Sequence, residues 1–189
     1  MSKINNIFYP EECFVSLCSF PKHKENALKL LKLIPTNVKE IILSKGIHVT
    51  DFFNQSINPD ISIDGECLGY FINGGRAIYL IPKNIFSDDA LVGLMAHELA
   101  HAYIFLTSPL KRAVLSFYYR IKIKNESEEV RFRYKYYNEK LKGEEYYADC
   151  LVRKWGLESY QKKLWVEEAE KMKKENLCPS QSEPVVSSK

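Results

Sequence analysis

The sequence predicts an α+β protein that is mostly α-helical and has one small antiparallel sheet. Three observations predict this class: a hairpin signature around Asn73-Gly74-Gly75, a long apolar helix after it, and a C-terminal half rich in helix formers. The 189 residues, 46% apolar and 27% charged, exclude a collagen-like fibre and a wholly disordered chain. We expect a single domain over residues 1–175 and a disordered tail over residues 176–189.

The N-terminal part should form two short helices and a strand. Apolar residues at helical spacing predict a helix over residues 25–34, which Pro35 ends. A second helix is expected over residues 38–44, with Gly46 as its C-terminal cap. The largely β-branched segment 47–50 then favours a strand.

A β-hairpin is the clearest strand signal. Two apolar segments, residues 69–72 and 76–81, flank the Asn73-Gly74-Gly75 turn, and Asn-Gly supplies the positive φ angles that a tight hairpin turn needs. Pro82 has no N–H to donate to a ladder, so the second strand should stop there. These two strands are the basis for expecting an antiparallel sheet.

A long helix should follow the hairpin, beginning near Asp88 and ending near Leu106, before Pro109. Ser87 can cap its first turn. Residues 111–142 are rich in helix formers and aromatics, and should form one long helix or two.

Two more helices are expected towards the C-terminus. Gly143 should break the preceding helical segment. A helix over residues 144–155 then ends at Gly156, and a last helix covers residues 158–174.

His97-Glu98-Leu99-Ala100-His101 is an H-E-x-x-H motif inside the predicted central helix. The four-residue spacing places His97 and His101 on one face, so that their ring nitrogens can reach one Zn²⁺ ion. Glu98 lies beside them and can take a proton from zinc-bound water. Three ionisable groups in this helix argue against a membrane span. The alternative is a structural pair of core histidines with a surface glutamate.

A catalytic zinc site needs a third protein ligand and one open position. Ile104 and Thr107 stand where a metzincin has its glycine and third histidine, which excludes that class. No histidine follows His101, so a downstream ligand must be a carboxylate. His23 and His48 remain alternatives upstream.

Glu145 and Asp149 are the strongest carboxylate candidates because they share a face, at positions i and i+4 of a predicted helix. Glu145 can bind the metal, and Asp149 can accept a hydrogen bond from the free ring nitrogen of a ligating histidine. Ala148 is small enough to let this helix approach the motif helix closely. Two alternatives stay open: Glu144 is the nearest competing ligand, and Asp149 can instead pair with Arg153.

Together, H-E-L-A-H and the segment E-Y-Y-A-D that begins 44 positions after His101 resemble the gluzincin zinc metallopeptidases, and the short chain resembles the minigluzincins among them. The resemblance covers residues 70–156. It implies a zincin-like fold: a small antiparallel sheet with an edge strand over an active-site helix, and a glutamate helix after it. It also implies His97, His101 and Glu145 as the ligands of one zinc ion, and Glu98 as the general base.

The same resemblance implies a zinc metalloendopeptidase that hydrolyses peptide or protein substrates. Asp149 would support a ligating histidine, and the edge strand would bind extended substrate by backbone pairing. The strand residues concerned are Ala77, Ile78, Tyr79 and Leu80. For the group that stabilises the oxyanion, the sequence leaves five unranked candidates: Tyr103, Tyr118, Tyr119, Tyr146 and Tyr147.

The basic aromatic insert, residues 110–142, is not explained by the motif. Between Lys111 and Lys142 it contains ten basic and four acidic residues. Interleaved cations and aromatics suit nucleic acid or another acidic surface, and can also line the cleft and select acidic substrates. The favoured interpretation is that the aromatics pack on the core while Lys and Arg stay solvated. The alternative function for the chain is a zinc-stabilised module that binds nucleic acid or protein without hydrolysis.

Five scattered cysteines, with no C-x-x-C pair, favour reduced thiols over a disulfide framework or a zinc ribbon. The first residues show no signal-peptide pattern, so a cytoplasmic location is the expectation. Cys178 can in principle fold back onto the open zinc position, although a solvated tail is expected instead.

Overall fold

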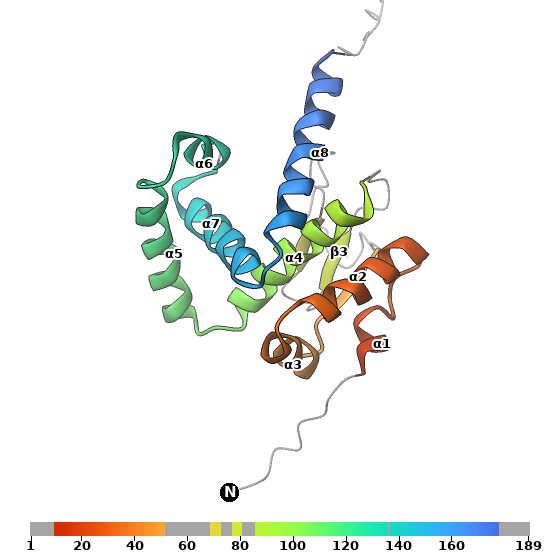
Figure 1. Ribbon diagram of the computed structural model, residues 1–189. Helices are drawn as coiled ribbons and strands as arrows, with labels where there is room; N and C mark the ends of the chain where they lie inside the picture. Colours follow the sequence, from red (N-terminus) through yellow and green to blue (C-terminus); the bar gives the residue numbers. More distant parts are fainter. Residues whose placement is uncertain (1–9, 52–68, 73–76, 81–85, 136, 178–189) are drawn as a thin grey trace, which may run out of the picture.

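The buried helix α4 (Asp88–Phe105) is the element around which the fold is built (Figure 1). The computed structural model describes residues 10–51, 69–72, 77–80, 86–135 and 137–177. Because α4 is apolar around most of its circumference, helices from both halves of the chain and the sheet can pack against it. The Ser87 hydroxyl accepts the Ala90 N–H at 3.3 Å, which confirms the predicted cap.

Three helices and a strand form the N-terminal part of the described chain. They are α1 (Glu11–Phe14), α2 (Pro21–Leu33), α3 (Thr36–Ser44) and β1 (His48–Thr50). Among them, α2 packs on α4. The predicted helices correspond to α2 and α3, and α2 begins early because proline suits the first helical position. Gly46 follows α3 with a φ of 65°, the left-handed conformation expected of a C-terminal cap.

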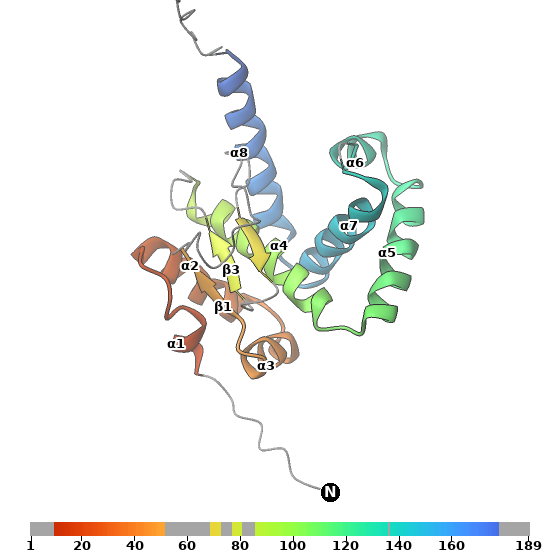
Figure 2. The same ribbon diagram turned by 180° about the vertical axis from the view of Figure 1, so that it is seen from behind.

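The sheet is mixed, with strand order β1-β3-β2. β2 (Gly69–Ile72) and β3 (Ala77–Leu80) form the predicted antiparallel pair, whereas β1 runs parallel to β3. The expectation of an antiparallel sheet is therefore wrong for one of the two pairings, because the hairpin pattern is local and carries no information about β1. The turn residues Asn73-Gly74-Gly75 lie outside the described residues. Seen from behind, the strands lie across one face of α4 (Figure 2).

β3 is the central strand of this sheet and not an edge strand. Ala77, for instance, lies opposite His48 of β1 and opposite Ile72 of β2. Two neighbours engage the backbone of β3, so it offers no free row of N–H and C=O groups to an extended peptide. The predicted substrate-binding edge strand is therefore wrong. The residues concerned are Ala77, Ile78, Tyr79 and Leu80.

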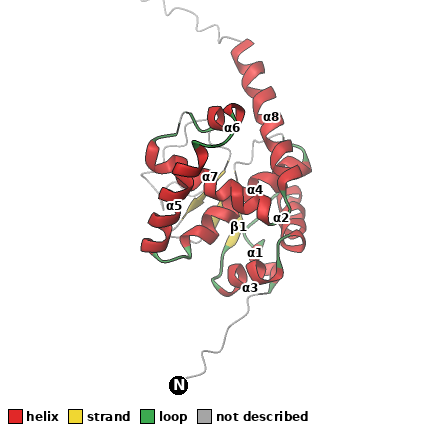
Figure 3. Cartoon of the chain, turned by 60° about the vertical axis from the view of Figure 1, so that its left-hand side comes forward, coloured by secondary structure: helices red, strands yellow, loops and turns green. Residues whose placement is uncertain are grey.

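In the described part of the chain, four helices follow α4: α5 (Pro109–Ile123), α6 (Glu128–Arg133), α7 (Glu139–Lys154) and α8 (Glu158–Leu177). The basic aromatic insert forms α5, α6 and the start of α7. α7 packs between α5 and α4, so the insert lies on the far side of α7 from α2 (Figure 3). None of the helices within the described ranges combines the length and apolarity that a membrane span requires.

The helix ends in this region match the prediction at one point and differ at another. Gly156, with a φ of 80°, follows α7 as the expected cap. α8 continues to Leu177, so residues 176 and 177 are helical and not part of a disordered tail as predicted. Residues 178–189, including Cys178, lie outside the described residues.

Gly143 lies inside α7 and does not break it. A Cβ atom at Gly143 would come within 2.1 Å of the backbone oxygen of Ser116 on α5. The glycine therefore permits the close packing of α5 on α7, where a sequence pattern indicates only a helix breaker.

We expect Gly143→Ala to destabilise the protein by about 1–3 kcal/mol, because the new methyl group overlaps backbone that cannot rotate away. Helix propensity alone predicts the opposite sign, a stabilisation of about 1 kcal/mol. Urea unfolding followed by circular dichroism decides between them. A variant as stable as the parent would contradict the contact-based explanation.

Candidate metal centre

Two helices, α4 and α7, bring the predicted ligands together. His97 and His101 lie one turn apart on α4, and Glu145 faces them from α7. Ala148 on α7 is fully buried, and its small side chain permits the close approach of the two helices. Within the described residues, His97, His101 and Glu145 are the group of histidine, cysteine and acidic side chains whose geometry could hold a metal ion.

The distances between the donor atoms have the size of the edges of a zinc tetrahedron. His97 Nε2 lies 3.1 Å from His101 Nε2 and 3.1 Å from Glu145 Oε2, and His101 Nε2 lies 3.4 Å from Glu145 Oε1. With zinc–ligand bonds of about 2.0–2.1 Å, ligand atoms of a tetrahedral site are about 3.3–3.4 Å apart. The chemistry and the spacing of this donor set therefore fit Zn²⁺.

Asp149 contacts the opposite nitrogen of His97. Its Oδ1 atom lies 2.8 Å from His97 Nδ1, so the predicted contact is present. An Nδ1–H that donates to this carboxylate leaves Nε2 unprotonated and directed at the other two ligands. Asp149 is buried, and two further groups donate to it: the Tyr134 hydroxyl to Oδ2 and Gln161 Nε2 to Oδ1.

The alternative assignments are not supported by the geometry. His23 is buried at the start of α2, with Nδ1 3.1 Å from the Asp51 carboxylate, and His48 Nδ1 lies 3.4 Å from the Gly46 carbonyl oxygen. Glu144 does not belong to the ligand group. Arg153 places its guanidinium against Cys150 Sγ at 3.1 Å, whereas Asp149 faces His97.

The charges at the centre favour a cation at the meeting point of the ligands. Burial would raise the pKa of the Glu145 carboxyl, but hydrogen bonds and charge from His101 and His97 lower it far below its ordinary value. Burial would likewise lower the pKa of His97, yet the charges and hydrogen bonds of Asp149 and Glu145 raise it well above its ordinary value. The same negative potential that retains a proton on His97 attracts a metal ion, which competes with that proton.

Glu98 lies beside the ligands in sequence and is buried, with 7% of its surface exposed. The charges of Glu98, Glu145 and Asp149 all act on one phenol, that of Tyr137. Although Tyr137 is 41% exposed, partial burial of its phenol raises its pKa above the ordinary value, and the charges of these carboxylates add to the shift. Tyr137 therefore lies within electrostatic reach of the metal centre, although its position in the insert gave no sign of this.

Glu168 of α8 is a second group that sequence reasoning missed. Burial raises the pKa of its carboxyl to about 7; the charge of His97 opposes this shift and that of Asp149 adds to it. No motif connects Glu168 to the H-E-x-x-H segment, and only the packing of α8 on α4 brings it near His97.

The five tyrosines considered for the oxyanion make other contacts. Tyr103 packs edge-on against Trp155, Tyr119 contacts Tyr118 and stacks on Tyr147 at 4.4 Å between ring centroids, and Tyr146 donates to Glu126. Instead, Tyr134 and Tyr137 are the tyrosines with direct or electrostatic links to the centre. The prediction that insert aromatics pack inward is confirmed for Tyr134, which is 3% exposed. It is wrong for Phe117, Tyr118 and Phe132, which are 56%, 57% and 60% exposed.

Comparisons of the chain with protein-family models, with curated proteins and with solved structures give no match. The residues of the candidate metal centre and their geometry are therefore the basis for a proposed function. Two features carry most of that argument: the converging donors on α4 and α7, and the buried carboxylate behind His97.

We expect Asp149→Ala to weaken zinc binding by about 10–100-fold, because His97 loses the acceptor that orients its ring. Tyr134→Phe removes one donor to the same carboxylate, so a smaller loss, about 3–10-fold, is expected. Competition titration with a chromogenic zinc chelator measures both affinities.

Tyr118→Phe is the matched control for the second variant, since Tyr118 is 57% exposed. It should bind zinc as the parent does. Unchanged zinc affinity in Asp149→Ala would show that this carboxylate does not orient His97.

Proposed function

We propose that the protein is a zinc-dependent peptidase of the gluzincin type. The single observation that carries this proposal is the convergence of His97 Nε2, His101 Nε2 and the Glu145 carboxylate, whose two oxygens each approach one histidine at a distance close to a tetrahedral edge. The donor set fits zinc, which when bound polarises a carbonyl oxygen and lowers the pKa of water towards neutrality. Two histidines on α4 and a glutamate on a later helix, α7, are the arrangement that the gluzincin resemblance implies.

Proton transfer and the orientation of the ligands would be carried out by side chains of the protein itself. Glu98, next to His97, accepts the proton of the attacking water and delivers it to the leaving amine. Asp149 keeps the Nδ1–H of His97 in place, so that its Nε2 stays a ligand throughout the reaction. Gln161 and Tyr134 hold Asp149 by hydrogen bonds from two other segments.

A zinc-stabilised binding module without hydrolysis is the competing function. A purely structural zinc site is closed by four protein ligands, whereas this group supplies three within the described residues. The side chains of His97 and His101 are each 19% exposed and that of Glu145 is 18% exposed, so the group is partly open to solvent. Partial exposure and a neighbouring carboxylate, Glu98, both favour catalysis.

We expect Glu98→Gln to keep its zinc and its fold but to lose peptide hydrolysis by about 100-fold or more, because an amide cannot act as the base. Digestion of a broad peptide library, with elemental analysis of metal content for each sample, is the measurement. A chelator should abolish the activity of the parent, and added zinc should restore it.

Glu144→Gln is the matched control, because it makes the same change in a partly buried glutamate of α7 outside the ligand group. It should retain parental activity. Equal turnover by Glu98→Gln and the parent would remove Glu98 as the base, and a zinc-loaded parent that cleaves nothing would favour the binding module.

A further inference from the structure

Helix α5 exposes a continuous apolar stripe. Of thirteen large hydrophobic residues that are exposed in the described part of the chain, five lie on this one helix. They are Leu110, Val114, Phe117, Tyr118 and Ile121, with exposures of 77%, 59%, 56%, 57% and 47%. At 100° per residue these positions fall within an arc of about 100°, the width of the apolar face of an amphipathic helix.

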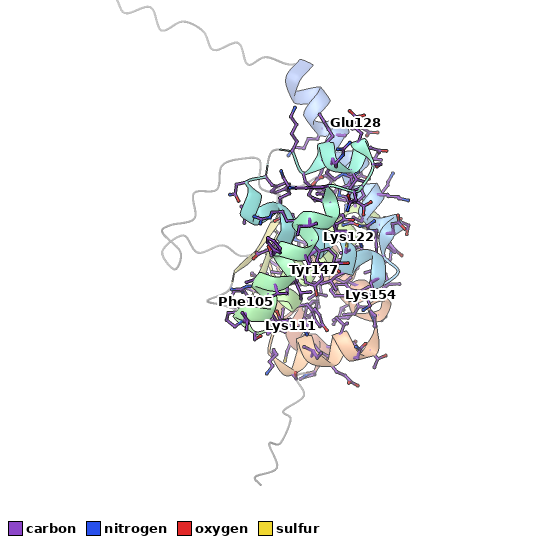
Figure 4. All side chains as sticks on the ribbon, turned by 90° about the vertical axis from the view of Figure 1, so that its left-hand side faces the viewer. Phe105, Lys111, Lys122, Glu128, Tyr147 and Lys154 are labelled. Carbon is purple, nitrogen blue, oxygen red and sulfur yellow. The ribbon has the colours of Figure 1, made fainter. Side chains whose placement is uncertain are left out.

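The opposite face of α5 packs on the rest of the protein, so the stripe is not the face that attaches this helix to the core. Ser116 meets Gly143 of α7, Tyr119 stacks on Tyr147 of α7, and Ile123 is buried. Figure 4 views the molecule from the side on which α5 faces outward, with Lys111 and Lys122 labelled towards its two ends. An apolar face that packing does not require needs another explanation.

The charged side chains of α5 itself are all basic. Residues 109–125 contain no aspartate or glutamate and five basic residues: Lys111, Arg112, Arg120, Lys122 and Lys124. On the helical projection, Lys111 and Lys122 border one side of the stripe and Arg120 borders the other. Cationic side chains along both borders of an apolar face are the pattern of helices that lie in the interface of an anionic bilayer.

We propose that α5 docks the protein on anionic phospholipid surfaces, with the stripe among the lipid headgroups and acyl chains and the basic borders on the phosphates. α5 is the outermost helix on its side of the molecule in both Figure 1 and Figure 2. An outlying helix such as α5 can sink into a lipid interface, because lipid molecules can rearrange around it. The docking leaves the helix parallel to the surface and needs no span.

Three other occupants fit these observations less well. A second copy would bring an equally basic α5 against the first, with repulsion between like charges. Single-stranded nucleic acid would match the charge and stack on Phe117 and Tyr118, but it offers no apolar partner for Leu110 and Val114. An acidic protein would need a groove whose shape matches α5, whereas a lipid surface can deform around the helix.

The test is cosedimentation of the full-length protein with sucrose-loaded vesicles of phosphatidylcholine, with and without about one third phosphatidylglycerol. We expect binding to the anionic vesicles that weakens as salt is raised. Lys111→Glu/Lys122→Glu should weaken it at least about tenfold, since each basic residue near such a surface contributes about a factor of five. Leu110→Gln/Phe117→Gln should weaken it to a similar degree while keeping the charge.

Lys24→Glu/Lys32→Glu is the matched control, because it makes the same charge change at two exposed residues of α2. This variant should bind as the parent does, and Glu98→Gln should too, which separates lipid docking from the proposed hydrolysis. No binding to anionic vesicles, or equal losses in the α2 and α5 charge variants, would overturn the proposal. Self-association or oligonucleotide binding that the α5 variants abolish, without vesicle binding, would assign the stripe to those partners instead.

Discussion

The geometry of the candidate metal centre depends on the hydrogen bonds that the buried Asp149 carboxylate accepts. A carboxylate removed from water is costly unless donors occupy its oxygens. Here the donors come from His97, Tyr134 and Gln161, which belong to α4, the insert and α8. Gln161 Oε1 is buried without a partner in the described residues, and exchanging it with Nε2 would set oxygen against oxygen. The charge of Asp149 thus fixes the Gln161 amide as well as the His97 ring.

The candidate ligands can be predicted from the sequence because each pair of residues lies within a single helix at a fixed spacing. His97 and His101 share a face of α4, and Glu145 and Asp149 share a face of α7, at positions that helical geometry alone relates. The prediction that a residue of the second helix joins the two histidines rests on chemistry, since a catalytic zinc site needs a third protein ligand. Tyr134 and the α8 residues were out of reach, because no fixed spacing connects them to Asp149 and only tertiary packing brings them close.

The same distinction separates the correct and incorrect parts of the fold prediction. The cap at Ser87 and the left-handed turn at Gly46 depend on local backbone geometry, and both are confirmed. The position of β3 depends on β1, a partner from a distant segment, so an edge strand was expected where a central one lies. The sequence predicts Gly143 as a helix breaker because a glycine at a helix contact and a glycine in a turn look alike in a sequence.

The insert has an inner side that packs on α7 and an outer face for which we propose lipid docking. Its inner side supplies Tyr134 to Asp149 and packs Ser116 against Gly143, two positions before the candidate ligand Glu145. Because that contact leaves no room for a methyl group, α5 and α7 cannot shift independently by much without overlap. A surface that holds α5 would therefore also set the position of the Glu145 helix. If α5 docks on lipid as we propose, its tight backbone contact with α7 connects the docking helix to the helix that carries Glu145.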